Sequence, residues 1–554
     1  MAFFVFFIIL IRLYFIQIEA TDCFYFNKET CKENISNEAK KRQIHLIKIA
    51  AQRGTIYDRN YNILAMSLPA KTLCINPSKL YRSSDKSISI LTNELNISRN
   101  KLNSLILKNK NKKELFIKRH VPKELYIKIK QLKNPYIYFI NENKRSYLGG
   151  ESFSNILGFT DIDDRGQEGI ELIKNETLSP VNGLKQVKQD NIGRPIETIK
   201  IIKKSKSGED ILLTIDKRIQ IIGYEILRKY INKFKAESGS IILIESDTGD
   251  ILSMANYPSF SPEKRNQFKG KNIKNRAVYD LIEPGSTIKP LIIYTALDQK
   301  IINKSTVINT APGVIKIKDK EIKDWKYLGS VSPADIIRLS SNIGAAKISS
   351  KLSKRQLLDG LSNFGFGQSL FINLPGSKTG SLPIVSELSE SGHMSLGYGY
   401  GLSMSLMHLA SAYTTLANYG KRVNINYLKN SNNGNDKESI LDDDKTKQVL
   451  SMMKEVVHSQ DGTGRRAAVQ GYTVYGKTGT VRQLVNGKYA KSVHNAIFVG
   501  ILGDPEPKYV AAVIVRNPKN REGSGGIHAA PIFSDFMQHS MRILSDQNYV
   551  TSNN

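Results

Sequence analysis

The chain has 554 residues, of which 40% are hydrophobic and 24% charged, an ordinary balance for a globular protein of two or three domains. Its 80 lysines and arginines exceed its 51 aspartates and glutamates, so the formal net charge is +29. The basic residues are spread along the chain and form no stripe with aromatic residues, which argues against a nucleic-acid partner. The eight histidines and three cysteines show no metal-ligand spacing, and we expect neither a metal nor another cofactor. The sequence leaves open whether Cys23 pairs with Cys31.

Residues 2–18 form an apolar run, AFFVFFIILIRLYFIQI, interrupted by Arg12. As a helix this run would be roughly 25 Å long, slightly less than the hydrocarbon core of a bilayer. A cleaved secretory signal is the alternative, but no small-x-small cleavage pattern follows the run. We therefore expect residues 1–19 to be a single-pass transmembrane signal anchor, with the rest of the chain on one side of the membrane.

Residues 20–205 indicate a lysine-rich domain of short strands and helices without a catalytic constellation, followed by a linker at 203–208. A domain with α/β patterning is expected from 206 to 546, and 547–554 would be a tail. Two groups of strands with a helical insertion between them predict an α+β sheet domain. Its expected elements are a helix capped by Asp216, a hairpin around 247–249, helices opened by Ser332 and at 343–352, strands at 472–481, 496–501 and 510–515, and a final helix at about 531–544.

The segment 283–290, EPGSTIKP, places Ser286 and Lys289 on one face of a helix if a helix begins there. A serine hydroxyl is a poor nucleophile until its proton is removed, and an unprotonated amine one turn away would remove it. The helix N-terminus offers free N–H groups and partial positive charge, which favour a tetrahedral oxyanion. A Ser-x-x-Lys pair alone occurs by chance in most chains of this size, so other motifs must support it.

Two further motifs follow in the chain. Ser340 and Asn342, in the sequence SSN, lie between two expected helices. There the serine would relay a proton and the asparagine would hold a peptide amide. An ordinary helix–helix turn explains these residue types equally well. The second motif is expected on a strand, where a glycine admits a substrate backbone and the lysine and threonines bind a carboxylate. Its residues are Lys477, Thr478, Gly479 and Thr480.

The letters Lys-Thr-Gly occur a second time, at residues 378–380. This copy follows Pro375-Gly376-Ser377 and leads into another proline, which is typical of a loop and not of a strand. It also lies much closer in sequence to Ser340 than Lys477 does. We therefore expect the 477–480 copy to be the functional one.

In this order the three motifs resemble those of penicillin-binding proteins and class A β-lactamases. Over nearly its whole length the chain resembles a class B penicillin-binding protein of the cell-division, FtsI-like type. The version SSNIG at 340–344 resembles the division type better than the elongation type, which stays the alternative. Further segments carry the likeness: RGTIYDRN at 53–60, LGFT at 157–160, GQEG at 166–169, MANYPSF at 254–260, NRAV at 275–278, GYGLS at 399–403 and GGIHAAP at 525–531.

The resemblance implies an α+β fold with an N-terminal membrane anchor, a mixed α/β pedestal domain, and a transpeptidase domain made of an antiparallel sheet, flanking helices and a helical subdomain. It implies a peptidoglycan D,D-transpeptidase in the bacterial inner membrane, with most of the chain on the periplasmic side, acting in septal synthesis. The implied partners are stem peptides and lipid-linked strands, β-lactams as covalent inhibitors, a SEDS-family glycosyltransferase and other divisome proteins.

The resemblance also assigns roles by motif. Ser286 would attack the penultimate D-Ala carbonyl, and a neutral Lys289 would take its proton. Ser340 would relay a proton to the leaving amine, and Asn342 would hold the donor peptide's amide. The N–H groups of Ser286 and Thr480 would form the oxyanion hole, and the substrate carboxylate would bind at Lys477, Thr478 and Thr480.

The chain departs from the family pattern only outside the three motifs, at Tyr61, Leu148, Ser405, His408 and Tyr475. Tyr61 replaces a glycine that is usual after Asp-Arg-Asn. A β-lactamase is the less favoured alternative, because no Glu-x-x-Leu-Asn element follows the SSN motif and the deacylating glutamate is therefore missing. A non-catalytic β-lactam sensor is also less favoured, because the serine and both lysines of the motifs are intact.

Overall fold

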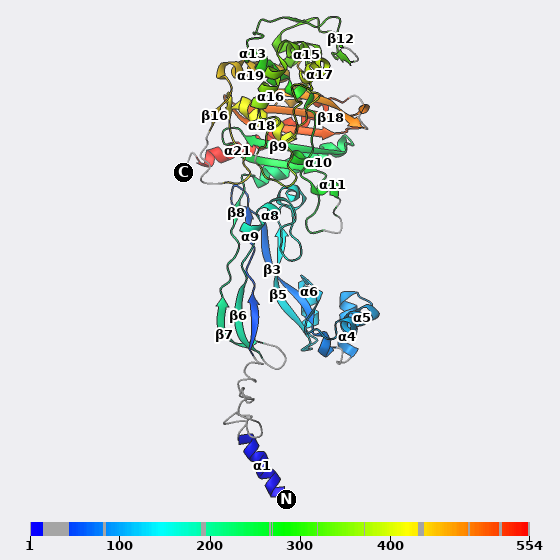
Figure 1. Cartoon of the computed structure of the whole chain (residues 1–554), viewed down its shortest axis with the longest axis vertical. Helices are drawn as coiled ribbons and strands as arrows, with labels where there is room; N and C mark the ends of the chain where they lie inside the picture. The colour runs from blue at the N-terminus through cyan, green and yellow to red at the C-terminus, as the bar shows by residue number, and fades with distance from the viewer. Residues whose placement is uncertain are drawn as a thin grey trace. The chain divides into compact units, whose positions relative to one another are not determined.

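The computed structural model describes residues 2–14, 44–80, 85–189, 195–264, 268, 270–317, 320–370, 372–429, 437–485, 488–519 and 523–551. The chain divides into two compact units, whose elements Figure 1 labels. The domain boundaries expected after residues 19, 205 and 546 stay predictions. The first unit comprises 1–54, 67–145 and 177–209, and the second comprises 55–66, 146–176 and 210–554.

Helix α1 (Ala2–Tyr14) covers most of the apolar run at the N-terminus. The run continues to residue 18, and residues 15–43, which include Cys23 and Cys31, lie outside the described part of the chain. Within the described part, no helix combines the length and the apolar character needed to cross a membrane. The anchor at 1–19 stays a prediction.

The first unit contains an antiparallel sheet in the order β1 (Ile44–Ile49), β6 (Gly183–Gln189) and β7 (Pro195–Lys203). The long strand β3 (Ile63–Ile75) pairs through its C-terminal end with β4 (Leu115–Lys118), and β5 (Ile137–Tyr147) also pairs with β3. Four helices accompany these strands: α3 (Pro77–Leu80), α4 (Asp85–Leu95), α5 (Arg99–Lys108) and α6 (Lys123–Lys130).

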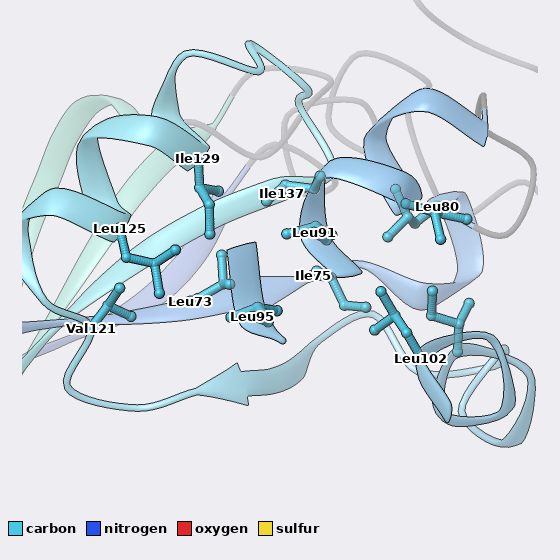
Figure 2. Packing of buried hydrophobic residues seen from close by; sticks show 12 residues of the cluster. Leu73, Ile75, Leu80, Leu91, Leu95, Leu102, Val121, Leu125, Ile129 and Ile137 are labelled. Atoms are coloured by element: carbon cyan, nitrogen blue, oxygen red, sulfur yellow. The ribbon is translucent and has the colours of Figure 1, made fainter. Parts of the chain in front are cut away.

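The core of the first unit is formed where one face of each helix meets β3 (Figure 2). On α4 the buried residues Ile88, Leu91 and Leu95 recur at intervals of three and four, the spacing of one helical face. The same spacing recurs on the other helices and brings them onto the strands. Other members of this core are Leu73, Ile75, Leu80, Leu102, Ile106, Val121, Leu125, Ile129 and Ile137.

The second unit is built on a five-stranded antiparallel sheet in the order β10-β9-β19-β18-β17. Every residue of β9 from 238 to 244 is buried, so this interior strand is covered on both faces. Strand β17, which carries residues 477–480, is at the edge of the sheet. The strands are β9 (Ser238–Glu245), β10 (Ile251–Tyr257), β17 (Thr473–Val485), β18 (Lys488–Gly503) and β19 (Pro507–Arg516).

Helices pack on this sheet and form a helical group beside it (Figure 1). Helices α10 (Lys217–Lys233) and α21 (Ala530–Thr551) pack on each other and on the sheet, and α18 (Leu406–Ala417) packs on β9, β18 and β19. Helix α13 (Lys289–Asp298) is buried over almost its whole circumference and packs against the rest of the helical group. That group contains α14 (Pro333–Arg338), α15 (Asn342–Lys351), α16 (Lys354–Asn363), α17 (Glu390–Leu396) and α19 (Asp443–His458).

Shorter elements complete the second unit, and none of them forms part of the β10-β9-β19-β18-β17 sheet, although β2 and β8 pair with each other and β2 pairs with β3. They are β2 (Ile56–Tyr57), η2 (Gly150–Ser152), α7 (Ser154–Leu157), α8 (Gly169–Ile173), β8 (Ile211–Leu212), α11 (Gly270–Ile273), α12 (Arg276–Tyr279), η4 (Gly285–Ile288), β11 (Ile308–Asn309), β12 (Val314–Ile317), β13 (Lys320–Lys323), β14 (Ser330–Val331), β15 (Lys421–Arg422), β16 (Glu438–Ser439), η5 (Arg465–Ala467) and α20 (Gly525–His528). The short helix α9 (Asn175–Leu178) lies where the two units meet along the chain.

The local signals in the sequence are confirmed here. Asp216 caps α10 by accepting from the N–H of Arg218, β9 and β10 form the expected hairpin, and Ser332 and Asp335 form a capping box at α14. The final helix is longer than expected and continues to Thr551, because no glycine or proline follows Leu544 to end it. Most of the tail predicted at 547–554 is therefore helical.

Replacing Leu91 by alanine is expected to lower the free energy of unfolding of the first unit by about 2–5 kcal/mol, because a fully buried leucine leaves a cavity. The only tryptophan, Trp325, lies in the second unit. Urea unfolding followed by far-UV circular dichroism should therefore show an earlier transition, while the tryptophan fluorescence transition stays in place. Leu107→Ala, at an exposed position of α5, is the control; an equal loss from it would contradict the assignment of the core.

Candidate active site

Ser286 lies in the 3-10 turn η4, which leads directly into α13 at Lys289. In a 3-10 turn, residues three apart lie one above the other, so both side chains share one face as the spacing predicted. Gly285 has φ +55°, and a Cβ there would lie 2.5 Å from Cγ2 of Val481 on β17. The glycine therefore lets η4, which carries Ser286, approach the strand. Ser286 is partly exposed, whereas Lys289 is completely buried.

The amine of Lys289 contacts the SSN motif at three acceptors. Its Nζ lies within hydrogen-bond distance of the carbonyl oxygen of Ser340 at 2.7 Å, Asn342 Oδ1 at 2.8 Å and Ser340 Oγ at 3.3 Å. Burial lowers the pKa of Lys289 well below its usual range, and the nearby Lys477 charge lowers it further, while Asp324 opposes the shift. The site therefore favours the neutral amine.

Ser340 lies between α14 and α15 in a left-handed backbone conformation, with φ 62°. A non-glycine residue in this region is strained, and such strain persists only where the surroundings impose it. Ser341 follows as the N-cap of α15, and its Oγ accepts the N–H of Gly344 at 2.9 Å. The turn that was the alternative interpretation therefore exists, and it presents Ser340 and Asn342 to Lys289.

Asp324, which belongs to none of the three motifs, fixes this turn through hydrogen bonds. The motifs gave no indication of this role. Directly after β13, its carboxylate accepts the hydroxyl of Ser341 at 2.8 Å, the N–H of Asn342 at 2.5 Å and the N–H of Ile343 at 3.1 Å. A negative charge is favourable at the N-terminus of α15. The amide of Asn342 also donates to the carbonyl of Lys323 at 3.0 Å, so the end of β13 fixes its orientation.

Lys477 approaches Ser340 from β17. Its Nζ donates to Ser340 Oγ at 2.9 Å and to the carbonyl oxygen of Thr478 at 3.1 Å, and the side chain is completely buried. Burial lowers the pKa of Lys477 to about 7. The amines of Lys289 and Lys477 thus meet at one serine hydroxyl, a convergence that residue spacing could not predict.

The other residues of the 477–480 motif lie against η4. A Cβ on Gly479 would lie 2.9 Å from Thr287 Cγ2, so this glycine sets the distance between β17 and η4. Thr478 is buried and its hydroxyl donates to Thr463 Oγ1 at 3.0 Å, another contact that the motifs did not indicate. Thr480 is exposed and accepts the N–H of Gly525 at 3.0 Å.

The second Lys-Thr-Gly copy lies elsewhere in the second unit. Residues 378–380 belong to no strand, and the amine of Lys378 lies 4.4 Å from the ring centroid of Tyr279. The 477–480 copy is the one whose lysine contacts Ser340. Among the residues that the structure describes, no cluster of three or more His, Cys, Asp or Glu side chains is placed to hold a metal ion.

Comparison with known proteins identifies two family domains. Residues 239–538 match the penicillin-binding protein transpeptidase domain, and residues 48–213 match the penicillin-binding protein dimerisation domain. The first of these matches contains all three motifs. The two matched regions together account for the two-domain, mixed α/β architecture.

Individual relatives cover nearly the whole chain. Peptidoglycan D,D-transpeptidase FtsI of Buchnera aphidicola subsp. Schizaphis graminum is 34% identical over 511 residues, which are 91% of this chain and 89% of that protein. Peptidoglycan D,D-transpeptidase FtsI of Escherichia coli K12 is 30% identical over 515 residues, covering 92% of this chain and 86% of that protein.

A solved structure shows the same fold. The crystal structure of a peptidoglycan synthetase from Bifidobacterium adolescentis has a TM-score of 0.70 and 23% identity, with 91% of this chain and 97% of that chain covered. The fold, the matched family domains and the relatives all indicate the same family over most of the chain. The chain therefore belongs to the class B penicillin-binding proteins of the FtsI type, the serine-type peptidoglycan D,D-transpeptidases.

Proposed function

We propose that Ser286 is the nucleophile with which this D,D-transpeptidase takes up one stem peptide and passes it to another. Ser286 attacks the penultimate D-Ala carbonyl, the terminal D-Ala leaves, and an amine of a second stem peptide then attacks the acyl-enzyme. One observation carries this assignment: the buried amine of Lys289, one turn along the chain from Ser286, converges with the buried amine of Lys477 on Ser340 Oγ. Such an arrangement supplies a base and a proton relay without a metal.

The acylation step depends on a neutral Lys289. Its burial and the neighbouring Lys477 favour the unprotonated amine, which takes the Ser286 proton as the hydroxyl attacks. Ser340 Oγ contacts both lysines and carries a proton to the leaving amine of D-Ala. In the second step the amine of another stem peptide attacks the acyl-enzyme. The two proton transfers then run in the opposite direction, so that Ser340 takes a proton from the attacking amine and Lys289 returns one to Ser286.

Substrate binding is assigned to the edge strand and to Asn342. Strand β17 is the last in the sheet order, so a peptide can pair with its free edge beside η4. Lys477, Thr478 and Thr480 bind the substrate carboxylate, while Gly479 leaves room for the backbone. The N–H groups of Ser286 and Thr480 bind the oxyanion, with about 3 kcal/mol expected from each donor. Asn342 holds the donor peptide's amide.

Benzylpenicillin is expected to acylate Ser286 and to remain bound. No second stem peptide is present to supply an attacking amine, and the sequence lacks the glutamate element that would activate water for deacylation. Intact-mass and peptide mass spectrometry of the full chain should show one adduct per chain, on the peptide containing Ser286. Ser286→Ala should abolish the adduct, whereas Ser350→Ala, at an exposed serine of α15, should leave it unchanged. Rapid hydrolysis of penicillin would instead indicate a β-lactamase, and an adduct in Ser286→Ala would assign another nucleophile.

Asp324→Asn is expected to shift the pH dependence of penicillin acylation. The Asp324 charge raises the pKa of Lys289, so removing it lowers that pKa further, and the rising limb of the acylation rate moves to lower pH. The maximum rate should also fall about tenfold, since the weakened hydrogen bonds at the SSN turn each contribute about 1.5–3 kcal/mol.

Stopped-flow acylation with a fluorescent penicillin between about pH 5 and pH 9 measures both effects. Asp461→Asn is the matched control, because Asp461 pairs with Arg338 and is not among the charges that act on Lys289. A limb that stays in place in Asp324→Asn would contradict the assignment of Lys289 as the base.

We further propose that the enzyme acts at the division septum, anchored in the inner membrane by residues 1–19 with its bulk in the periplasm. Three features of the sequence support this placement: the expected domain boundaries, the SSNIG form of the SSN motif, and the apolar run at 2–18. The pedestal at 20–205 would bind a SEDS-family glycosyltransferase and other divisome proteins, and the tail would lie beyond residue 546. An elongation role is the alternative.

A fluorescent protein fused to the N-terminus is expected to form a membrane-associated ring at the division site. Depletion of the protein should give filaments, because septal cross-linking stops while elongation continues. A deletion of residues 2–18 is the control and should release the fusion from the membrane fraction. A signal along the side wall with rounding cells on depletion would indicate elongation, and a membrane-bound deletion variant would contradict the anchor.

A further inference from the structure

Trp325, the only tryptophan of the chain, directly follows Asp324 in the segment between β13 and β14. It is 64% exposed, and a single exposed apolar side chain needs no explanation by itself. Its polar end, however, is bound, because the indole N–H donates to the carbonyl oxygen of Leu339 at 2.8 Å. The ring therefore adds little to a core but makes a defined contact directly before Ser340.

The carbonyl that accepts this hydrogen bond lies at the end of a helix. Leu339 is the C-cap of α14, and carbonyls in the last turn of a helix lack partners within it. The carbonyls on either side are also bound: that of Arg338 accepts the hydroxyl of Thr463 at 3.2 Å, and that of Ser340 lies 2.7 Å from Lys289 Nζ. Three separate parts of the chain thus hold three successive carbonyls, and the indole holds the middle one.

Asp324 and Trp325 hold the SSN turn, residues 340–342, from its two ends. The Asp324 carboxylate accepts two N–H groups that follow Ser340, whereas the indole donates to the carbonyl that precedes it. The carbonyl of Leu339 lies in the peptide plane whose rotation defines φ of Ser340. A donor fixed on that carbonyl therefore restrains this φ directly, which the contacts after Ser340 do not do.

The restraint matters because Ser340 has φ 62°, a conformation that a non-glycine residue keeps only where its surroundings impose it. Relaxation to a negative φ would displace the side chain from its present direction. Ser340 Oγ now lies 3.3 Å from the amine of Lys289 and 2.9 Å from that of Lys477. Both distances depend on the backbone conformation that the indole helps to hold.

The hairpin of β12 and β13, and not the burial of Trp325, sets the position of this contact. Ile322 of β13 shares a buried cluster with Ile343 and Ala346 of α15. The amine of Lys326 lies 4.7 Å from the centroid of the indole ring, which favours one orientation of the ring. Removal of the indole N–H alone should consequently leave the fold intact.

We propose that Trp325 is a positioning residue of the transpeptidase. Its indole N–H holds the peptide plane before Ser340 and so keeps Ser340 Oγ between the amines of Lys289 and Lys477. It acts through Ser340 and not on the substrate. The inference rests on the proposed function, since it concerns the proton relay that the acylation of Ser286 uses, and it adds a residue that belongs to none of the three motifs.

Replacement of Trp325 by 3-benzothienylalanine, which has the shape of tryptophan but sulfur in place of the N–H, tests the proposal in the full chain. Stopped-flow measurements over a range of fluorescent penicillin concentrations separate the dissociation constant of the initial complex from the acylation rate constant. The rate constant should fall about fivefold, the effect of one ordinary hydrogen bond. The dissociation constant and the melting temperature should stay unchanged, because only the relay is displaced.

Trp325→Phe, which also lacks the donor, should reduce the rate constant to a similar extent. Tyr327→Phe is the matched control: it alters an exposed aromatic side chain of the same segment and should leave the rate constant unchanged. An unchanged rate constant in the isostere would overturn the proposal, as would an effect confined to the dissociation constant. A fall in melting temperature with the isostere would indicate a structural role instead.

A double-mutant cycle with Asp324→Asn tests whether the two residues act on the same turn. The double variant should lose less than the product of the two single effects, because residues that share one partner are not independent. Effects that multiply fully would overturn the joint action.

Ser286→Ala separates this inference from the function on which it rests. An adduct that persists in Ser286→Ala would overturn the proposed nucleophile and with it the role of Trp325. Loss of the adduct in Ser286→Ala together with an unchanged rate constant in the isostere would overturn the role of Trp325 alone.

Discussion

The site depends on two lysine amines that are buried together at one serine hydroxyl. Lys289 and Lys477 are both completely buried and both donate to Ser340 Oγ. Two ammonium groups held this close in a protein interior repel each other and lack the water that would stabilise their charges. The fold therefore favours a neutral Lys289, and a neutral amine is what a serine nucleophile requires of its base.

The surrounding structure holds these two amines in place. Lys289 is the first residue of a helix that is buried from 289 to 297, so its backbone has little freedom to move away. Ser340 keeps a left-handed backbone because the Asp324 carboxylate fixes the residues that follow it. Strand β17 completes the arrangement by bringing Lys477 to the same hydroxyl. The local strain at Ser340 is thus balanced by packing and hydrogen bonds from three separate elements.

Much of the fold was predictable because local chemistry determines it. The caps at Asp216 and Ser332, the hairpin at 247–249 and the strands of the sheet follow from short-range patterns, and the structure contains them. The end of α21 was misjudged because no local signal marks it. Tyr61, which stands where the family usually has glycine, still adopts a left-handed φ of 61°, so the turn that Asp58 organises imposes the conformation on a residue that disfavours it.

The sequence by itself indicated which residues make up the candidate site, because Ser286, Lys289, Ser340, Asn342 and the strand at 477–480 follow one another in the order of a known set of three motifs. It also distinguished the Lys-Thr-Gly copy on a strand from the copy in a loop, because the residue patterns of strands and loops are local. Only the tertiary structure showed that both lysines meet at Ser340 and that Asp324 fixes the turn. Burial and mutual charge set the pKa of a lysine, and these are properties of the packed interior that residue spacing does not encode.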